Sequence, residues 1–202
     1  MKAGDALKDK IIELLIAENN GVIKTANVVS SGISKDYFYR YAVRAELEKT
    51  AHGVYVSPDV LTDELYLIQA QFPKVVFSHE TALYLHDLAE KEPIPVTVTV
   101  PAKYNSLRLI EKGVKIIYVK NEWYNMGLRD SKSPGGHSIN IYDMERTICD
   151  IIRKRREMDI AVFNYALKEY IKRKDKDLSR LIDYAVIMHM ERKLRNVIEV
   201  LL

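Results

Sequence analysis

The sequence predicts an α+β fold in which a small N-terminal domain precedes a larger mixed domain. Residues 1–58 indicate short helices followed by one hairpin, residues 59–142 add several strands, and residues 143–202 are dominated by helices. Strands grouped ahead of a run of helices are typical of α+β proteins. The 202 residues, with 48% hydrophobic and 29% charged side chains, are enough for two small domains with packed cores.

The composition excludes several classes of protein. Cys149 is the only cysteine, so an intramolecular disulfide and a multi-cysteine zinc site are both ruled out. No uncharged apolar run approaches the roughly 18 residues of a transmembrane helix, and the N-terminus has no apolar signal core. The formal net charge of +3 is too small to indicate a nucleic-acid partner by itself. We therefore expect a cytoplasmic protein that has no membrane partner.

The N-terminal domain, residues 1–58, is predicted to contain three helices and a hairpin. The helices cover residues 5–18, 26–30 and 35–46, with an extended link at 22–24 and a hairpin tip at 51–53. Thr25 and Ser34 are the expected caps of the second and third helices, and Gly32 suits the tight turn between them. This order of elements is that of a winged helix-turn-helix, in which the third helix enters the major groove of DNA.

The third predicted helix carries side chains of the kinds that contact DNA. Phe38, Tyr41, Ala42 and Ala45 fall on one face, which leaves basic and aromatic residues outside it. Arginine can pair bidentately with guanine, and lysine and hydroxyl groups suit contacts with phosphates. The candidate DNA-binding residues are Lys24, Thr25, Ser34, Lys35, Tyr37, Arg40, Arg44, Lys49 and His52. A solvated helix of mixed charge, or a winged domain that binds protein, would give a similar pattern.

The second domain, residues 59–202, is predicted to be a mixed α/β domain with a helical C-terminal half. The predicted strands cover residues 75–77, 96–100, 114–119 and 138–142, and residues 131–136 are expected to form a turn or a mobile loop. Three side chains are expected to cap helices, namely Thr62, Ser78 and Asp143. The last three predicted helices follow. One begins at Asp159, and the other two cover residues 178–189 and 191–202.

Basic residues are concentrated in residues 151–176, where nine Lys or Arg stand against four acids. The candidate members of a basic face are Arg153, Arg156, Lys172 and Arg173. Such a face could bind an anionic ligand such as the DNA backbone or an RNA, or it could be a solvated surface without a ligand.

No catalytic or metal-binding motif is present. The chain has no glycine-rich phosphate loop and no His-Glu-x-x-His pair, and its five histidines are dispersed. Ser78 is interpreted as a helix cap and not as a nucleophile paired with His79, because neighbours at a helix start are not expected to face one another productively. Asp143 and Glu145 are interpreted as cap and first-turn residues, and not as metal ligands. We therefore expect no enzymatic activity, no cofactor and no metal.

Several motifs of the chain point to a known family. They are Gly32-Ile33-Ser34 with Gly53-Val54-Tyr55-Val56, the segment SHETALYLHDL from Ser78 to Leu88, and the segment YDMERTICDIIR from Tyr142 to Arg153. Together with the final helices they resemble AbiEi-type antitoxins, the antitoxin members of AbiE abortive-infection (type IV toxin–antitoxin) systems of phage defence. The resemblance covers essentially the whole chain.

The resemblance implies a function for each domain. The winged helix-turn-helix is expected to bind inverted repeats in the promoter of its own operon and to act as a transcriptional repressor. The C-terminal domain is expected to counteract a nucleotidyltransferase-type toxin without forming a stable complex with it. His52 at the wing tip departs from the family, in which a basic residue often precedes the glycine. The alternative is a protein-interaction or toxin-modifying antitoxin whose winged domain does not bind DNA.

Overall fold

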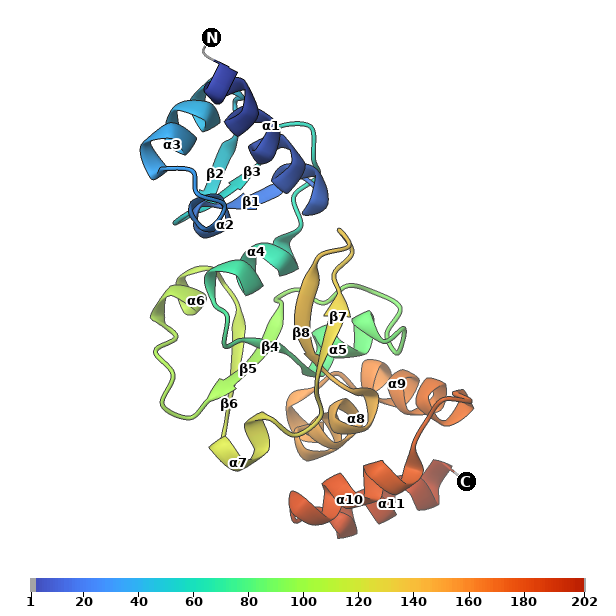
Figure 1. The fold of residues 1–202 in the computed structure, drawn as a ribbon. Helices are drawn as coiled ribbons and strands as arrows, with labels where there is room; N and C mark the ends of the chain where they lie inside the picture. Colours follow the sequence, from blue (N-terminus) through green and yellow to red (C-terminus); the bar gives the residue numbers. More distant parts are fainter. Residues whose placement is uncertain (1–2, 202) are drawn as a thin grey trace. The chain divides into compact units, whose positions relative to one another are not determined.

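The computed structural model describes residues 3–201, and the chain divides into two compact units. The first unit extends to Pro73 and includes the later segment Lys132–Ser138, whereas the second comprises Lys74–Ser131 and the residues from Ile139 onward. The expected domain boundary at Pro58 therefore does not coincide with the division between the units. The fold is α+β, as predicted (Figure 1).

The first unit is built on a three-stranded antiparallel sheet in the strand order β1-β3-β2. Its helices are α1 (Ala3–Glu18), α2 (Thr25–Ser30), α3 (Lys35–Arg44) and α4 (Glu64–Gln71), and its strands are β1 (Val22–Lys24), β2 (Glu48–Ala51) and β3 (Val54–Val56). Val22 lies opposite Val56 in this sheet, and Lys24 lies opposite Val54.

Both faces of this sheet are covered, which explains why the unit extends beyond Pro58. Ile23 and Tyr55 pack with the core of α1, α2 and α3, which includes Ile12 and Phe38. The alternate residues of the same strands form a second cluster, Val22, Val54 and Val56, against which Tyr66, Leu67 and Ala70 of α4 pack. Successive side chains of a strand point to opposite faces, so the continuous apolar run of β3 requires a helix on each side.

The segment Lys132–Ser138 is held in the first unit by a buried polar cluster. Asp63 Oδ2 lies 2.7 Å from His137 Nδ1 and accepts a hydrogen bond from Ser133 Oγ at 2.5 Å. His137 Nε2 is 3.0 Å from the carbonyl oxygen of Asn19, and the imidazole ring stacks on Tyr66 with ring centroids 4.1 Å apart. The turn expected at residues 131–136 is thus observed in its later part, whereas Ser131 and Lys132 are the last residues of strand β7 (Leu128–Lys132).

The second unit contains a mixed five-stranded sheet in the order β6-β5-β4-β8-β7. The strands are β4 (Val76–Phe77), β5 (Thr97–Pro101), β6 (Lys115–Val119), β7 (Leu128–Lys132) and β8 (Ser138–Tyr142). Strand β4 is antiparallel to β5 and parallel to β8, and β5 is parallel to β6. The short helices α6 (Leu107–Glu111) and α7 (Asn121–Tyr124) and the edge strand β7 were not predicted from the sequence.

Helices form the rest of the second unit, and α8 lies at their centre. They are α5 (His79–Leu85), α8 (Met144–Arg153), the 3-10 turn Arg155–Glu157, α9 (Ile160–Lys172), α10 (Leu178–Ile187) and α11 (Glu191–Leu201). Every residue of α8 from Glu145 to Ile152 is buried, and its apolar side chains share one core with Leu83, Phe163 and Leu181. The predicted helical C-terminal half is thus observed.

The predicted helix caps are partly correct. Ser34 accepts a hydrogen bond from the Tyr37 backbone N–H at 3.3 Å, and Asp143 accepts one from that of Arg146 at 2.8 Å, so both are caps as expected. The cap of α4 is Asp63 and not Thr62, because the Asp63 carboxylate reaches the Tyr66 N–H at 3.1 Å. Ser78 makes no capping hydrogen bond, and Thr25 is the first residue of α2 instead of its cap.

Candidate nucleic-acid interface

A hollow of about 590 Å³ opens on the first unit between α2, the first turns of α3 and the β2–β3 turn. It brings together four of the predicted DNA-binding residues, Lys24, Thr25, Lys35 and His52. Tyr39 also lines it, whereas no carboxylate does. The hollow therefore has the charge expected of a surface that receives an anion.

Lys24 lies at the end of β1 and is half-buried. Its Nζ is 5.3 Å from the centre of the Tyr66 ring, close enough for a cation–π contact. Burial lowers the pKa of Lys24 below its ordinary value, because removal from water disfavours the charged form.

Thr25 follows at the start of α2 and is only 7% exposed. Its backbone N–H donates to the carbonyl oxygen of Gly53 at 2.8 Å, which ties α2 to the β2–β3 turn. Gly53 has a φ of +72°, a conformation that L side chains rarely adopt, so this turn favours glycine. The Thr25 hydroxyl, in contrast, has no hydrogen-bond partner within the part of the chain that the structure describes.

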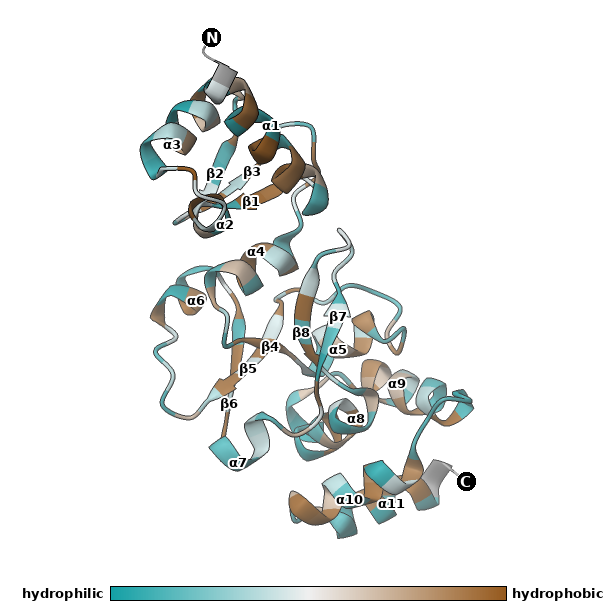
Figure 2. Ribbon diagram, in the orientation of Figure 1, coloured by the Kyte–Doolittle hydropathy of each residue, from teal (hydrophilic) through white to brown (hydrophobic). Residues whose placement is uncertain are grey.

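Helix α3 presents Lys35 and Tyr39 to the hollow. The two residues are four positions apart and therefore lie on the same side of the helix. Figure 2 shows α3 as largely hydrophilic in colour. Tyr39 is an exposed aromatic residue of this helix, with 44% of its surface accessible. Tyr39 was not among the predicted site residues, although its spacing from Lys35 was a usable signal.

Tyr37 and Arg44 lie on another side of α3 and contact α1. The Tyr37 hydroxyl is 2.8 Å from both Asp9 Oδ1 and the carbonyl oxygen of Asp5, and Arg44 Nη2 donates to Asp9 Oδ2 at 2.7 Å. Partial burial and the Asp9 carboxylate raise the pKa of Tyr37. The guanidinium of Arg40 lies 5.9 Å from the Tyr37 ring. The predicted single outward face of α3 is therefore divided in two.

The remaining predicted contacts of this unit are exposed or serve as caps. Lys49 is exposed on β2 opposite Tyr55 and does not line the hollow, and Ser34 is the cap of α3. His52 is exposed at the β2–β3 turn and lines the rim of the hollow.

The four candidate members of the basic face, Arg153, Arg156, Lys172 and Arg173, are mostly paired with neighbouring acids. Arg153 is 3.4 Å from Asp150, Lys172 is 2.6 Å from Glu169, and Arg173 makes two contacts with Asp175 at 2.8 and 2.9 Å. Arg156 precedes α9 and Lys172 ends it, so a helix of roughly 20 Å separates them. Three of the four charges thus already have an acidic partner.

The YDMERTICD segment forms a buried polar network within the second unit. Arg146 is fully buried, and its Nε donates to Asp150 at 3.0 Å while its Nη1 donates to the carbonyl oxygens of Trp123 and Met126. Glu145 accepts hydrogen bonds from the Tyr170 hydroxyl at 3.2 Å and the Asp177 backbone N–H at 2.9 Å. Glu145 is therefore a core group, and more than the first-turn acid that the sequence indicated.

Ser78 and His79 are closer than the sequence indicated. Ser78 Oγ lies 3.0 Å from His79 Nδ1 and accepts a hydrogen bond from Thr99 Oγ1 at 2.8 Å. The two neighbouring side chains therefore contact each other. Both residues are buried, at 0% and 3% exposure, so they form part of the core instead of an accessible cleft.

The described residues lack two features. They contain no group of three His, Cys, Asp or Glu side chains positioned to hold a metal ion. No helix in the described part of the chain has both the length and the apolarity needed to cross a membrane.

Of the comparisons with known proteins, the one with solved structures bears on the fold, and on the fold alone. No protein-family model matches the sequence, and no curated protein matches it. Among solved structures, the Rv2827c protein from Mycobacterium tuberculosis is similar to this chain, with a TM-score of 0.55 over 86% of this chain and 70% of that one. The two sequences are 12% identical, so the similarity defines a shared α+β architecture.

Proposed function

We propose that the first unit is a winged helix-turn-helix and that it binds double-stranded DNA. The observation that carries this proposal is the hollow, because it groups Lys24, Lys35 and His52 where α2, α3 and the β2–β3 turn meet. The arrangement of α1, α2 and α3 with a three-stranded antiparallel sheet supports the same assignment. In this proposal α3 enters the major groove and the β2–β3 turn contacts the backbone.

The proposal assigns different roles to α3 and to the residues around the hollow. Lys35 and Tyr39 are in the N-terminal half of α3, the part of a recognition helix that contacts base edges. Lys24, Thr25 and His52 surround the same hollow and are suited to phosphates, which fix the register of the protein on DNA.

We further propose that the chain is the antitoxin and autorepressor of a type IV toxin–antitoxin operon. This rests on the resemblance of the Ser78–Leu88 and Tyr142–Arg153 segments to AbiEi-type antitoxins. The operator would be inverted repeats in its own promoter, and the functional partner a nucleotidyltransferase-type toxin.

Fluorescence anisotropy tests the proposed DNA binding. It compares a duplex taken from directly upstream of the gene with a scrambled duplex of equal length. We expect tighter binding to the upstream duplex and a steep loss of affinity as salt rises, because each neutralised phosphate releases counterions. Equal affinity for both duplexes at moderate salt would contradict specific operator binding.

A growth-rescue experiment tests the proposed antitoxin function. The gene of the proposed nucleotidyltransferase-type toxin is expressed alone and together with this chain, from a promoter that the chain cannot repress. We expect growth arrest in the first case and recovery in the second. Persistent arrest, with both proteins present, would contradict the antitoxin assignment.

One observation favours a second function for the first unit. Arg44 and Tyr37 already contact Asp9 and Asp5, so half of the predicted DNA-binding face of α3 is occupied by α1. A unit that binds protein instead of DNA is compatible with this arrangement. Growth rescue without binding to either duplex would support that alternative.

A further inference from the structure

We propose that the chain forms a symmetric dimer through a groove between α10 and α11, so that the same groove of a second copy occupies it. Helices α10 and α11 follow one another through residues 188–190 and pack side by side (Figure 1). The inference does not depend on DNA binding, because every residue that carries it lies in the second unit.

The first observation is an exposed apolar stripe on α10. Leu178, Ile182 and Val186 follow one another at intervals of four residues and therefore lie along one side of the helix. Their exposed fractions are 44%, 52% and 49%, and Figure 2 shows apolar segments along α10. Single apolar residues are normal on a protein surface, whereas a contiguous apolar patch marks an interaction site.

A groove of about 250 Å³ lies beside this stripe. Ile182 and Ala185 of α10 and Leu194 and Ile198 of α11 form its apolar lining. Leu194 is buried, whereas Ile182 is exposed and belongs to the stripe as well as to the groove. An exposed apolar side chain next to a groove allows two identical surfaces to fill one another.

The charges around the groove are complementary to themselves. The other lining residues, Glu191, Arg195 and Glu199 of α11, are exposed and alternate in sign at intervals of four residues. Within residues 3–201 none of these three forms an ion pair. When two copies of α11 meet antiparallel about a two-fold axis near Val197, each Arg195 faces Glu199 of the other copy. This axis also lies next to Ile198, in the apolar part of the groove.

These charges favour a second copy over a partner of a single sign. A strongly basic partner would place a like charge against Arg195, and a strongly acidic one would do so against the glutamates. A second copy pairs Arg195 with Glu199 twice, as an isologous interface does. Such a dimer carries two first units, which matches the two half-sites of the proposed inverted repeat.

Sedimentation equilibrium of the full chain, over about 1–100 μM, tests the proposal. We expect an average mass that rises from 23.3 kDa toward twice that value. Ile182→Glu should weaken the dimer at least about a hundredfold, because each copy then places a carboxylate in the apolar groove of the other. Ile182 is half exposed in the single chain, so the variant should fold, and circular dichroism verifies this.

The matched control is Ile160→Glu. Ile160 begins α9 in the same unit and has the same exposed fraction as Ile182, 52%. This substitution should leave the dimer unchanged. A wild-type chain that stays monomeric up to about 100 μM would overturn the inference. An equal loss of the dimer in Ile160→Glu, or a dimer that persists in Ile182→Glu, would overturn it as well.

Charge reversal tests the pairing of Arg195 with Glu199. Arg195→Glu should weaken the dimer about tenfold, since it replaces two attractive contacts with two repulsive ones. Adding Glu199→Arg to this variant should restore the dimer, and no recovery would contradict the proposed interface. A monomeric wild-type chain that binds the proposed toxin, and loses it in Ile182→Glu, would overturn self-association and assign the groove to the toxin.

Discussion

Arg44 on α3 donates a hydrogen bond from Nη2 to Asp9 Oδ2 on α1 at 2.7 Å, so a predicted DNA contact is held by an acid of its own unit. The same carboxylate accepts a hydrogen bond from the Tyr37 hydroxyl at 2.8 Å. Because Arg44 is still 56% exposed, this ion pair is a weak one in water. It nevertheless neutralises a cation on the proposed interface, and its removal has a measurable consequence.

Asp9→Asn is expected to tighten DNA binding severalfold. The substitution removes the negative charge next to Arg44 and frees its guanidinium for a phosphate, so the slope of log affinity against log salt should become steeper by about one. Anisotropy over a salt series measures both quantities. Glu18→Gln removes an equal charge from the exposed end of α1 and is the control. An equal gain of DNA affinity in Glu18→Gln would show that the effect comes from net charge alone.

Lys35→Ala and Tyr39→Ala should weaken operator binding more than Arg44→Ala does. The first two residues line the hollow, whereas Arg44 contacts Asp9. A residue that contacts a base edge contributes about 1–3 kcal/mol and its loss relaxes specificity. Paired titrations with upstream and scrambled duplexes measure this. A larger loss of specificity in Arg44→Ala than in Lys35→Ala would contradict the assignment of the two sides of α3.

His137→Ala is expected to lower the free energy of unfolding by about 1–3 kcal/mol, because it removes one partner of the buried Asp63 carboxylate, which then keeps only the hydrogen bonds from Ser133 and from the Tyr66 N–H. The His137 side chain is 4% exposed and that of Asp63 is 3% exposed. Urea denaturation measures the change. His52→Ala removes an exposed histidine and should have little effect. Equal stability of the two variants would show that the Asp63–His137 contact contributes nothing measurable.

Stability is expected to fall as the pH rises above about 9, in part through Cys149. Burial raises the pKa of the Cys149 thiol from 9.0 to about 12 in the folded chain. Between these two values the unfolded chain releases a proton that the folded chain keeps, so one such group removes up to about 1.4 kcal/mol per pH unit. Urea denaturation at pH 8, 9 and 10 measures the slope. A slope in Cys149→Ala as steep as that in the wild type would contradict this contribution.

Local signals were sufficient for the α+β class, for most helices and for the Ser34 and Asp143 caps, since periodicity and capping act within a few residues. Strand β7 was missed because its sequence LRDSK is charged and mostly exposed, without the alternation that indicates a buried face. The Asp63–His137 contact joins residues 74 positions apart, and no local pattern records such a contact.

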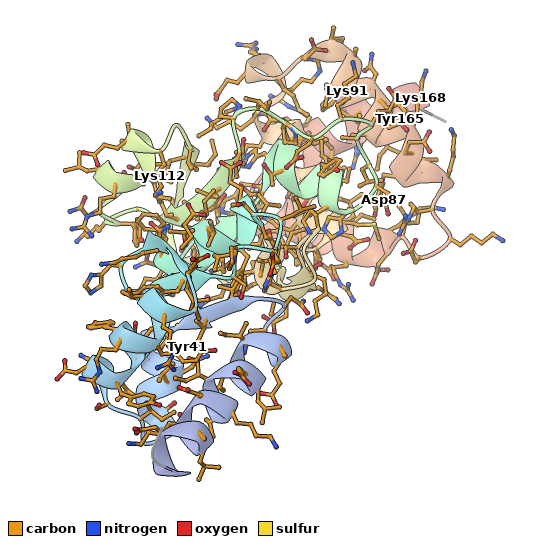
Figure 3. The ribbon with its side chains drawn as sticks, turned by 90° about the horizontal axis from the view of Figure 1, so that it is seen from above. Tyr41, Asp87, Lys91, Lys112, Tyr165 and Lys168 are labelled. Atoms are coloured by element: carbon orange, nitrogen blue, oxygen red, sulfur yellow. The ribbon has the colours of Figure 1, made fainter. Side chains whose placement is uncertain are left out.

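The candidate nucleic-acid interface was predicted only in part, because residue type and position do not show which side of α3 lines the hollow. Lys24, Thr25, Lys35 and His52 were identified by residue type and position, and the structure brings them to one hollow. Tyr37 and Arg44 were assigned to the same surface, although they lie four and three residues from Tyr41, which Figure 3 labels and which is 7% exposed. Their side of α3 contacts α1 through Asp9, although the Arg44 side chain stays 56% exposed. This contact depends on how α1 packs, which the sequence of α3 does not show.

The turn at Lys132–Ser138 also affects how the chain folds during synthesis. The first unit includes this segment, so its last contacts cannot form until Ser138 has left the ribosome. At about 5–20 residues per second, the interval after Pro73 emerges lasts seconds, during which Asp63 lacks its partner His137. A nascent chain stalled before Ser133 should therefore carry a first unit that proteases cleave more readily than one stalled well beyond Ser138.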